Sequence, residues 1–412
     1  MKASLLLLAA PAALWPQDST APAFTQRGYF ETRNYFYPRT APNDSGRIVS
    51  EELLRWEGQW KARPSLRLNL SVDSRFDSHR QFERALRLDW FDRGIQRPAI
   101  SVRRLSAVYS KGGLTLEGGR QFIRWGKADL LNPTDRFAPK DFLNVLNTEF
   151  LGVWAARATY ERGANTFDLV WQPYFTPSRS PLLNQRWVVL PPQLNGIPLR
   201  DEGFRFPGRG QWGARYSRLA GGAEFSLSVF DGFNHLPLLD AGVLALPQLS
   251  VTLQRYFARI IMGAGDLALP LRWFTLKAEA AYFASSTPQA DEYAQYVLQA
   301  ERLAGEWTFV GGYAGEVVTT RRNPLDFAPD RGLTKTFLGR ASYNIDSNRA
   351  VALETAVRQN LHGLYTKVEY SQAVGAHWRL TLSGVLLAGR DTDFLGQYKR
   401  NSHVAAAVRY SF

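Results

Sequence analysis

A dense run of charged residues lies between Gly119 and Asp141 of this chain. If this stretch folds into the opening of a wide pore, its side chains would form a charged constriction, because rings of charge set the ion preference of such pores. The residues with this possible role are Arg120, Arg124, Lys127, Asp129, Asp135, Arg136, Lys140 and Asp141. A structural role is the alternative, since Asn-Pro-Thr-Asp at 132–135 is typical of a turn and the arginines could pair with nearby carboxylates.

A second set of charges alternates with apolar residues along the chain instead of clustering. Its cations are Arg55, Arg67, Arg75, Lys277, Arg358, Lys367, Arg379 and Arg409. Its anions are Glu57, Asp73, Asp168, Glu279, Glu354 and Glu369. We expect these side chains to line a hydrated interior and mostly to pair across neighbouring strands. The formal net charge is +13, but no contiguous basic block is present, so we predict no nucleic-acid partner.

Patterns typical of catalysis or metal binding are weak. The histidines are scattered, without the His-x-x-x-His or His-Glu-x-x-His spacing of a metal site. There is no cysteine, which excludes disulfides, Cys-ligated zinc and thiol nucleophiles. Neither a Gly-x-Ser-x-Gly elbow nor a phosphate-binding glycine loop occurs. We therefore predict no enzyme, metal or cofactor, and the open alternative is a hydrolase whose Ser–His pair forms in space.

The alternating charges belong to segments that read as two-faced strands. Clear examples are Leu54–Lys61, Leu66–Arg75, 274–282, 351–358 and 378–386. Alternation with a period of two places apolar side chains on one face of a strand and polar side chains on the other. Each segment runs for about 9 to 13 residues, as a strand tilted by about 45° needs to cross an apolar band roughly 25 Å tall. The pattern predicts an all-β fold, a transmembrane antiparallel β-barrel of about 16–18 strands with long outer loops.

The predicted connections alternate in length, as they do where short periplasmic turns face longer outer loops. Turns rich in Gly and Asn are predicted at 63–64, 111–113, 162–165, 220–222, 304–305, 346–348 and 373–375. Long loops are predicted at 38–46, 77–96, 126–150, 176–210, 232–247, 285–295, 319–332 and 389–400. Two connections break the alternation, because 360–363 is short where a long loop is due and 263–270 is long for a turn. These breaks are why the predicted strand number spans a range.

The N-terminus has the features of a signal peptide, since Lys2 precedes the apolar stretch Leu5–Trp15. That stretch is well short of the roughly 20 apolar residues that a membrane-spanning helix needs. No later apolar run reaches this length, so a helical membrane protein is excluded. We expect cleavage between residues 13 and 23, which divides the chain into a signal peptide, 1–23, and a single outer-membrane β-barrel domain, 24–412.

The final strand carries a family resemblance. Residues 402–412 alternate without a break, with Val404, Val408, Tyr410 and Phe412 on one face. This ending resembles the C-terminal signal of bacterial outer-membrane β-barrels, in which the last strand closes on Phe with an aromatic residue two positions earlier. The resemblance implies the outer membrane of a Gram-negative-type bacterium. It also implies that Tyr410 and Phe412 act as the membrane-insertion signal for the barrel-assembly machinery.

A second resemblance lies in the charged run. The sequence Gly-Arg-Gln at 119–121, Trp-Gly at 125–126 and Asn-Pro-x-Asp at 132–135 resembles a segment of large outer-membrane barrel families. Some of these families are of unknown function, and others are linked to the export of polysaccharides or hydrophobic molecules. The resemblance covers only about 20 residues, so it suggests membership in such a family without specifying a substrate.

The loop predicted at Thr176–Gly210 combines six prolines with an apolar run that begins at Leu182. Loops longer than about 15 residues are usually functional or disordered, and this one is too apolar for disorder. It could plug the lumen or bind a hydrophobic substrate. The alternatives are an outer cap or a latch between subunits.

Together these patterns predict an outer-membrane channel that passes a small or chain-like solute through a basic, loop-constricted lumen, with anionic or polyhydroxylated solutes favoured. The expected partners are outer-membrane lipid, the barrel-assembly machinery, the translocated solute and a periplasmic protein. The first alternative is a plugged barrel that binds or anchors a surface polysaccharide or a periplasmic partner. The second is an outer-membrane hydrolase. The substrate, the direction of transport, an open or plugged lumen and the oligomeric state are left open by the sequence.

Overall fold

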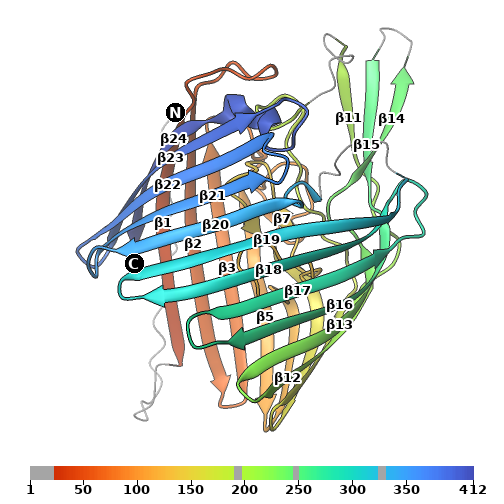
Figure 1. Ribbon diagram of the computed structural model, residues 1–412, viewed down its shortest axis with the longest axis vertical. Coiled ribbons are helices and arrows are strands. Elements are labelled where there is room, and N and C mark those ends of the chain that lie inside the picture. The colour runs from red at the N-terminus through yellow and green to blue at the C-terminus, as the bar shows by residue number, and fades with distance from the viewer. Residues whose placement is uncertain (1–22, 190–196, 245–249, 323–330) are drawn as a thin grey trace.

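The structure is a computed structural model, and it describes residues 23–189, 197–244, 250–322 and 331–412. Within these residues, 18 long strands form a closed wall in which each strand is antiparallel to both neighbours (Figure 1). The last wall strand pairs with the first, so that Val404 lies opposite Phe36 and Ser411 opposite Tyr29. The predicted antiparallel β-barrel is thus confirmed, at the upper end of the predicted strand number. The predicted signal peptide lies outside the described residues, apart from Ala23.

The elements follow one another along the chain with little helix. The wall strands are β1 (Phe24–Phe36), β2 (Ile48–Arg63), β3 (Leu66–Asp77), β5 (Ile100–Lys111), β6 (Leu114–Gln121), β9 (Val153–Arg162), β10 (Asn165–Gln172), β12 (Gln211–Ala220), β13 (Ala223–Phe233), β16 (Arg259–Pro270), β17 (Thr275–Ala284), β18 (Glu292–Ala304), β19 (Trp307–Thr320), β20 (Thr336–Asn344), β21 (Arg349–Arg358), β22 (Gly363–Val374), β23 (Trp378–Gly389) and β24 (His403–Ser411). The connections hold β4 (Leu88–Asp89), β7 (Lys140–Asp141), β8 (Glu149–Phe150), β11 (Leu199–Phe204), β14 (Leu238–Leu244), β15 (Ser250–Tyr256) and the 3-10 helix η3 (Gly396–Asn401). No helix in the described part of the chain is long and apolar enough to cross a membrane.

The wall has an apolar outer face and a polar inner face. In β2, Leu54 and Trp60 are exposed on the outside, whereas Arg55 is buried on the inside opposite Asp73 of β3. The same alternation runs through β24, where Val404 is exposed and His403 is buried. A belt of exposed apolar side chains around a closed sheet fits lipid, because closure leaves no unpaired strand edge in the hydrocarbon.

The connections differ between the two rims of the barrel. Eight turns of two to four residues join strands at one rim, and the connections at the other rim are longer except for residues 359–362. The turn predicted at 263–270 is wrong, because these residues belong to β16 and the turn is 271–274. The glycines of this segment imitate a turn, but Asp266 points inward and pairs with Arg215 of β12, with N–O distances of 2.9 and 3.0 Å.

A small sheet projects beyond the rim that carries the long connections (Figure 1). Its strands β14 and β15 lie within the connection from β13 to β16, so the predicted end of this loop near Pro247 is wrong. β15 pairs with β14 on one side and, in parallel, with β11 on the other. The alternation of Val251 and Leu253 with polar neighbours has the period of a wall strand, so pattern alone could not separate the two.

The last residue takes part in closure of the barrel. Phe412 exchanges two backbone hydrogen bonds with Gly28 of β1, each with an N–O distance of 2.9 Å. Its ring covers Gly28 so closely that an added Cβ would lie 2.6 Å from the ring. Tyr410 is partly exposed and contacts the rings of His377 and Trp378, with centroids 5.5 and 5.0 Å away.

Removal of Phe412 is expected to lower the yield of assembled barrel several-fold, because the closing hydrogen bonds and the terminal aromatic ring are both lost. The heat-modifiable mobility of the folded barrel in gels measures that yield. Phe412→Tyr is the matched control and should assemble normally. Full yield after the deletion would show that the terminus is not an insertion signal.

Candidate pore and constriction

The connection between β6 and β9, residues 122–152, folds into the barrel and is called the inner loop here. Its start is held by Glu279, a buried residue on the inner face of β17. The Glu279 carboxylate accepts hydrogen bonds from the backbone N–H groups of Lys127 and Ala128, at 2.5 and 2.6 Å, and from the hydroxyl of Thr134 at 3.0 Å. The inner loop is therefore attached to a wall strand distant in sequence.

Two of the candidate constriction residues strengthen this attachment. Asp129 forms an ion pair with Lys277 of β17 at 2.6 Å. Lys127 lies 2.5 Å from Glu224 of β13 and 3.5 Å from Asp266 of β16. The side chain of Lys127 is only 10% exposed, so its ammonium group pairs with carboxylates of the wall strands and does not face open water.

Three further candidates sit in the middle of the inner loop. The Arg124 Nε donates to Asp135 at 2.6 Å, and Asp135 also accepts from the backbone N–H of Trp125 at 3.2 Å. Burial raises the pKa of the Asp135 carboxyl, although the Arg124 guanidinium acts against that shift. The guanidinium of Arg136 lies over the ring of Phe283 at 4.9 Å.

Arg120 has a different environment. It lies opposite Leu105 of β5 and Trp154 of β9, in the register of the outer face. Its side chain is fully buried, where it donates to the carbonyl of Trp90 at 2.6 Å and pairs with Asp92 at 3.3 Å. The structure thus places Arg120 beneath the connection between β3 and β5, in the wall itself.

An apolar cluster fills the interior next to the inner loop. Its members come from the loop and from the inner faces of the wall strands: Ile123, Trp125, Phe137, Val153, Ala155, Val170, Phe230, Ile260, Met262, Ala281, Phe283 and Tyr293. Phe137 packs edge-to-face between Trp125 and Phe230, with both centroid distances 5.1 Å. This cluster excludes water from the side of the lumen bounded by β9 to β18.

The end of the inner loop joins a network of buried ion pairs. Asp141 accepts from Arg97 at 2.8 Å and from Arg179 at 3.2 Å. Burial alone would raise the pKa of Asp141, but the two guanidinium groups overcome burial and lower it to about 2. The network therefore ties the inner loop to the connections on either side of it.

The low pKa of Asp141 predicts a loss of stability in strong acid. A carboxyl group whose pKa is depressed on folding stabilises the protein above its unfolded value, near 3.8, and the contribution is lost as the pH falls toward 2. The difference in pKa corresponds to about 2 kcal/mol. The melting temperature of the folded barrel at pH 5 and pH 2.5 measures this effect. Asp141→Asn should show a smaller difference between the two pH values, and an equal difference would contradict the assignment.

Two of the wall arginines meet the last part of the inner loop. Arg55 forms a bidentate pair with Asp73, with both N–O distances 2.7 Å, and reaches Glu149 at 3.1 Å. Arg75 lies 2.7 Å from Glu149 and 3.0 Å from Asp73. These side chains come from β2, β3 and the inner loop, and they bring opposite charges together at one side of the lumen.

The segment from Phe175 to Val189, called the crossing segment here, spans the lumen at the rim with the long connections. Its far end is held by Arg186, which donates to the carbonyl of Gly46 at 2.6 Å and lies 3.6 Å from the centre of the Tyr37 ring. Trp187 is fully buried and contacts the rings of Tyr398 and His403, with centroids 5.7 and 6.5 Å away, in an apolar cluster that includes Tyr35 of β1. Residues 190–196 of the predicted loop lie outside the described residues.

A histidine joins the crossing segment to the inner loop. One ring nitrogen of His235 lies 2.6 Å from the carbonyl oxygen of Thr176, and the other lies 2.8 Å from that of Arg136. Burial lowers the pKa of His235 to about 4, so the ring is neutral at neutral pH. A neutral imidazole has one N–H, so only one of these two contacts is a donated hydrogen bond.

Two of the cavities in the described part of the structure lie between the end of the inner loop and the wall strands β1 to β3 and β22 to β24. The first has a volume of about 270 Å³ and is lined by Tyr29, Glu31, Arg33, Glu51, Glu52, Leu53, Arg55, Arg75, Phe76, Asp77, Arg97, Asn147, Glu149 and Arg409. The second, about 60 Å³, shares Arg33 and Asn147 with the first and also contains Lys367 and Glu369. The first cavity is lined by five arginines and five carboxylates. The lining carries both signs of charge in equal number.

The remaining candidate pore residues have different environments. Arg409 pairs with Glu31 at 2.6 Å and lines the larger cavity. Arg358 pairs with Asp393 at 3.1 Å and so braces an outer connection. Among the described contacts, neither Arg67 nor Arg379 has an ion-pair partner, and both side chains are exposed. The candidates thus divide between the cavities, the loop attachments and the wall.

Sequence reasoning missed the partners that hold this site together. Arg97, Arg179 and Trp187 lie in long connections, where no alternation marks a side chain as inward. Glu279 was predicted to be inward, but its role depends on backbone N–H groups, which have no sequence signature. The spacing of charges therefore identified inward-facing residues of the wall strands but not the residues of the long connections that cross the lumen.

The structure bears on whether a Ser–His pair or a metal site forms in space. Among the described residues, no hydrogen bond joins a serine hydroxyl to a histidine ring, and His79 instead contacts Asp44 at 2.6 Å. No group of three or more His, Cys, Asp or Glu residues gathers in the described part of the chain as a metal site would require.

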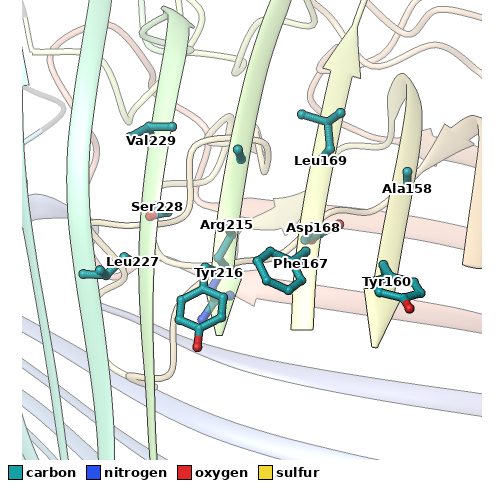
Figure 2. Close-up of a pocket in the computed structure, with 11 residues that line it drawn as sticks. Ala158, Tyr160, Phe167, Asp168, Leu169, Arg215, Tyr216, Leu227, Ser228 and Val229 are labelled. Carbon is teal, nitrogen blue, oxygen red and sulfur yellow. The ribbon is translucent and has the colours of Figure 1, made fainter. Parts of the chain in front are cut away.

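A groove of about 490 Å³ lies on the outer face of β9, β10, β12 and β13. Figure 2 shows Tyr160, Phe167 and Tyr216 side by side across three of these strands, next to the small residue Ala158. Aromatic side chains of this kind favour the edge of the lipid layer. The groove faces lipid, and it is not part of the candidate pore.

The fold is similar to that of several solved bacterial proteins, one of which is a porin. A BenF-like porin from Pseudomonas fluorescens Pf-5 matches with a TM-score of 0.54 and 10% identity over 94% of this chain and 98% of the porin. OccAB3 of Acinetobacter baumannii matches with a TM-score of 0.52 and 8% identity over 94% of this chain and 99% of its own. OpdQ of Pseudomonas aeruginosa matches with a TM-score of 0.50 and 10% identity over 94% of this chain and 98% of its own. No protein-family model matches the chain, and no curated protein is similar to it in sequence.

Proposed function

We propose that this chain, a porin-like β-barrel of the Gram-negative outer membrane, passes a small polyhydroxylated solute through the cavity beside β1 to β3. The observation that carries the proposal is the paired lining of that cavity. Arg409 pairs with Glu31 at 2.6 Å, Arg75 with Glu149 at 2.7 Å, and Arg33 with Glu31 at 3.0 Å. Three of the five lining carboxylates, those of Glu31, Glu51 and Glu149, lie beside a guanidinium, so a simple anion entering the cavity meets repulsion as well as attraction.

Hydroxyl groups suit such a lining better than charges do. A hydroxyl donates to a carboxylate and accepts from a guanidinium, and each guanidinium has five N–H donors, so paired arginines keep donors for a solute. The ring of Tyr29 adds an apolar face to the cavity, with Arg409 4.1 Å from its centre. A sugar-like solute therefore satisfies more of this lining than an anion of the same size.

A matched pair of solutes tests this selectivity. In the swelling of vesicles that contain the purified protein, glucose should enter several-fold faster than gluconate, which has the same carbon skeleton and a carboxylate. Glu31→Gln is expected to shift the preference toward gluconate, because Arg33 and Arg409 both lose their carboxylate partner. Glu57→Gln, which changes a carboxylate outside the cavity lining, is the control. Faster entry of gluconate into vesicles with the unaltered protein would contradict the proposal.

A plugged barrel is the second candidate function, and the crossing segment favours it. That segment reaches from one side of the rim to the other, where Arg186 and Trp187 attach it to the β1 and β24 side. A barrel closed in this way could hold a surface polysaccharide or a periplasmic partner without passing a solute. The absence of any current from the unaltered protein in a lipid bilayer would favour this function over a channel.

A further inference from the structure

We propose that the connection between β3 and β5 docks the phosphate-bearing glycolipid of the outer leaflet. The part of this connection from Glu83 to Phe91 is called the outer flap. Its apolar side chains would contact acyl chains, and its arginines Arg84 and Arg87 would contact the phosphates. This inference does not depend on what passes through the lumen.

Strand pairing places the outer flap in the wall, on its lipid side. β4 pairs in parallel with the start of β5, with Leu88 opposite Ile100 and Asp89 opposite Ser101. Ser101 also lies opposite Asp73, which points into the lumen, so Ile100 and Leu88 point outward. β4 thus continues the wall above Gln121, where β6 ends and the chain turns into the lumen.

Hydrogen bonds hold the flap against the outer face. The carbonyl of Trp90 accepts from Arg120 at 2.6 Å and from the indole N–H of Trp154 at 3.1 Å. Phe91 contacts the rings of Trp154 and Tyr174, with centroids 5.9 and 5.6 Å away. Because Arg120 and Trp154 share the outward register, the flap lies on the lipid side of both.

The flap exposes more apolar surface than an aqueous loop should. Leu86 is 85% exposed, Trp90 48%, Leu88 43% and Phe91 42%. An exposed apolar patch of this kind marks an interaction surface. The patch adjoins the outer face of the wall, since Leu88 lies opposite Ile100 of β5 and the ring of Phe91 contacts that of Trp154 on β9. The position of this patch beside the outer face of the wall therefore indicates that lipid covers it.

The charges of the flap favour a phosphate-bearing lipid, and not a second copy of this chain, as its binding partner. Arg84 is exposed and has no ion pair among the described contacts, and the exposed Arg87 has only the partly buried carboxylate of Glu83 at 3.0 Å. Burying these cations against another protein would cost free energy without a matching anion. The flap lies at the rim with the long connections, the outer side of such barrels, where lipid phosphates supply that anion.

Single-cysteine probes test the position of the flap, and the chain has no cysteine of its own to interfere. We would label Leu86→Cys with a fluorophore in phosphatidylcholine vesicles that contain nitroxide-labelled phosphatidylcholine. Leu227→Cys, on the lipid-facing wall, and Leu239→Cys, on the projecting sheet, are the two references. The probe at residue 86 should be quenched by the labelled lipid as strongly as the probe at 227. Quenching by aqueous iodide, as at 239, would overturn the proposal, and so would protection from both quenchers, which would indicate a second copy.

A binding measurement tests the phosphate contacts. Purified lipopolysaccharide would be titrated onto the detergent-solubilised protein and onto Arg84→Ala, Arg87→Ala and the double variant. Each substitution should weaken binding about fivefold, as expected for one arginine near an anionic lipid surface. Arg200→Ala, an exposed arginine on the projecting sheet, is the matched control and should bind normally. Binding by the double variant that equals the control would overturn the proposal.

Discussion

Replacement of Glu279 by alanine is expected to release the start of the inner loop from β17 and to raise the conductance of the barrel several-fold. The carboxylate is buried and accepts hydrogen bonds from Lys127, Ala128 and Thr134. Its loss leaves buried donors without an acceptor, each at a cost of about 1–3 kcal/mol. For the three donors together we therefore expect a loss of about 3–5 kcal/mol in the stability of the attachment.

Hydrogen exchange and single-channel recording measure the two parts of this result. The amides of Lys127 and Ala128 should lose protection in Glu279→Ala, and the unit conductance of the same protein should increase. Glu354→Ala is the matched control, because Glu354 is also on the inner face but is about one-third exposed and lies 3.7 Å from Arg340. Unchanged protection and conductance in Glu279→Ala would show that the inner loop does not depend on this attachment.

Replacement of Trp187 by alanine is expected to detach the crossing segment. The indole is 1% exposed and packs among Tyr35, Tyr37 and Leu387, so its removal leaves a large cavity. Truncation of a buried aromatic side chain typically costs about 3–5 kcal/mol. The segment should then become sensitive to protease added on the side of the long connections, at a concentration that leaves the unaltered protein intact.

The control for Trp187→Ala is Trp273→Ala, which changes an exposed tryptophan in the turn between β16 and β17. Trp187→Phe, which keeps an apolar ring, should retain most of the resistance to protease. Equal cleavage of the unaltered protein and Trp187→Ala would mean that the crossing segment is not fixed by this contact.

The wall could be predicted from the sequence because a closed barrel has lipid on one side and polar groups on the other. That difference is imposed on every second residue, and β2, β3 and β23 show it as predicted. The sequence analysis assigned Arg120 to a charged constriction, whereas strand pairing puts it in the outward register, where its side chain is buried. Its partners, the Trp90 carbonyl and Asp92, lie about 30 residues earlier in the chain and carry no periodic signal.

The path of the long connections could not be predicted, because it depends on contacts without a sequence pattern. The inner loop is held to Glu279 by backbone N–H groups, which any residue except proline provides. The projecting sheet could not be predicted because its strand β15 does have a sequence pattern, but the pattern is that of the wall. β15 has the alternation of a wall strand, and only its pairing with β11 and β14 shows that it lies outside the wall.

Single-channel recording of the purified, unaltered protein in a planar lipid bilayer tests the central claim most directly. The paired cavity beside β1 to β3 predicts small, steady current steps in potassium chloride, with weak preference between anion and cation and partial block by added sugar. Glu279→Ala recorded in the same way should give larger steps. Silence in both proteins would contradict a channel and would leave the plugged barrel as the function of this chain.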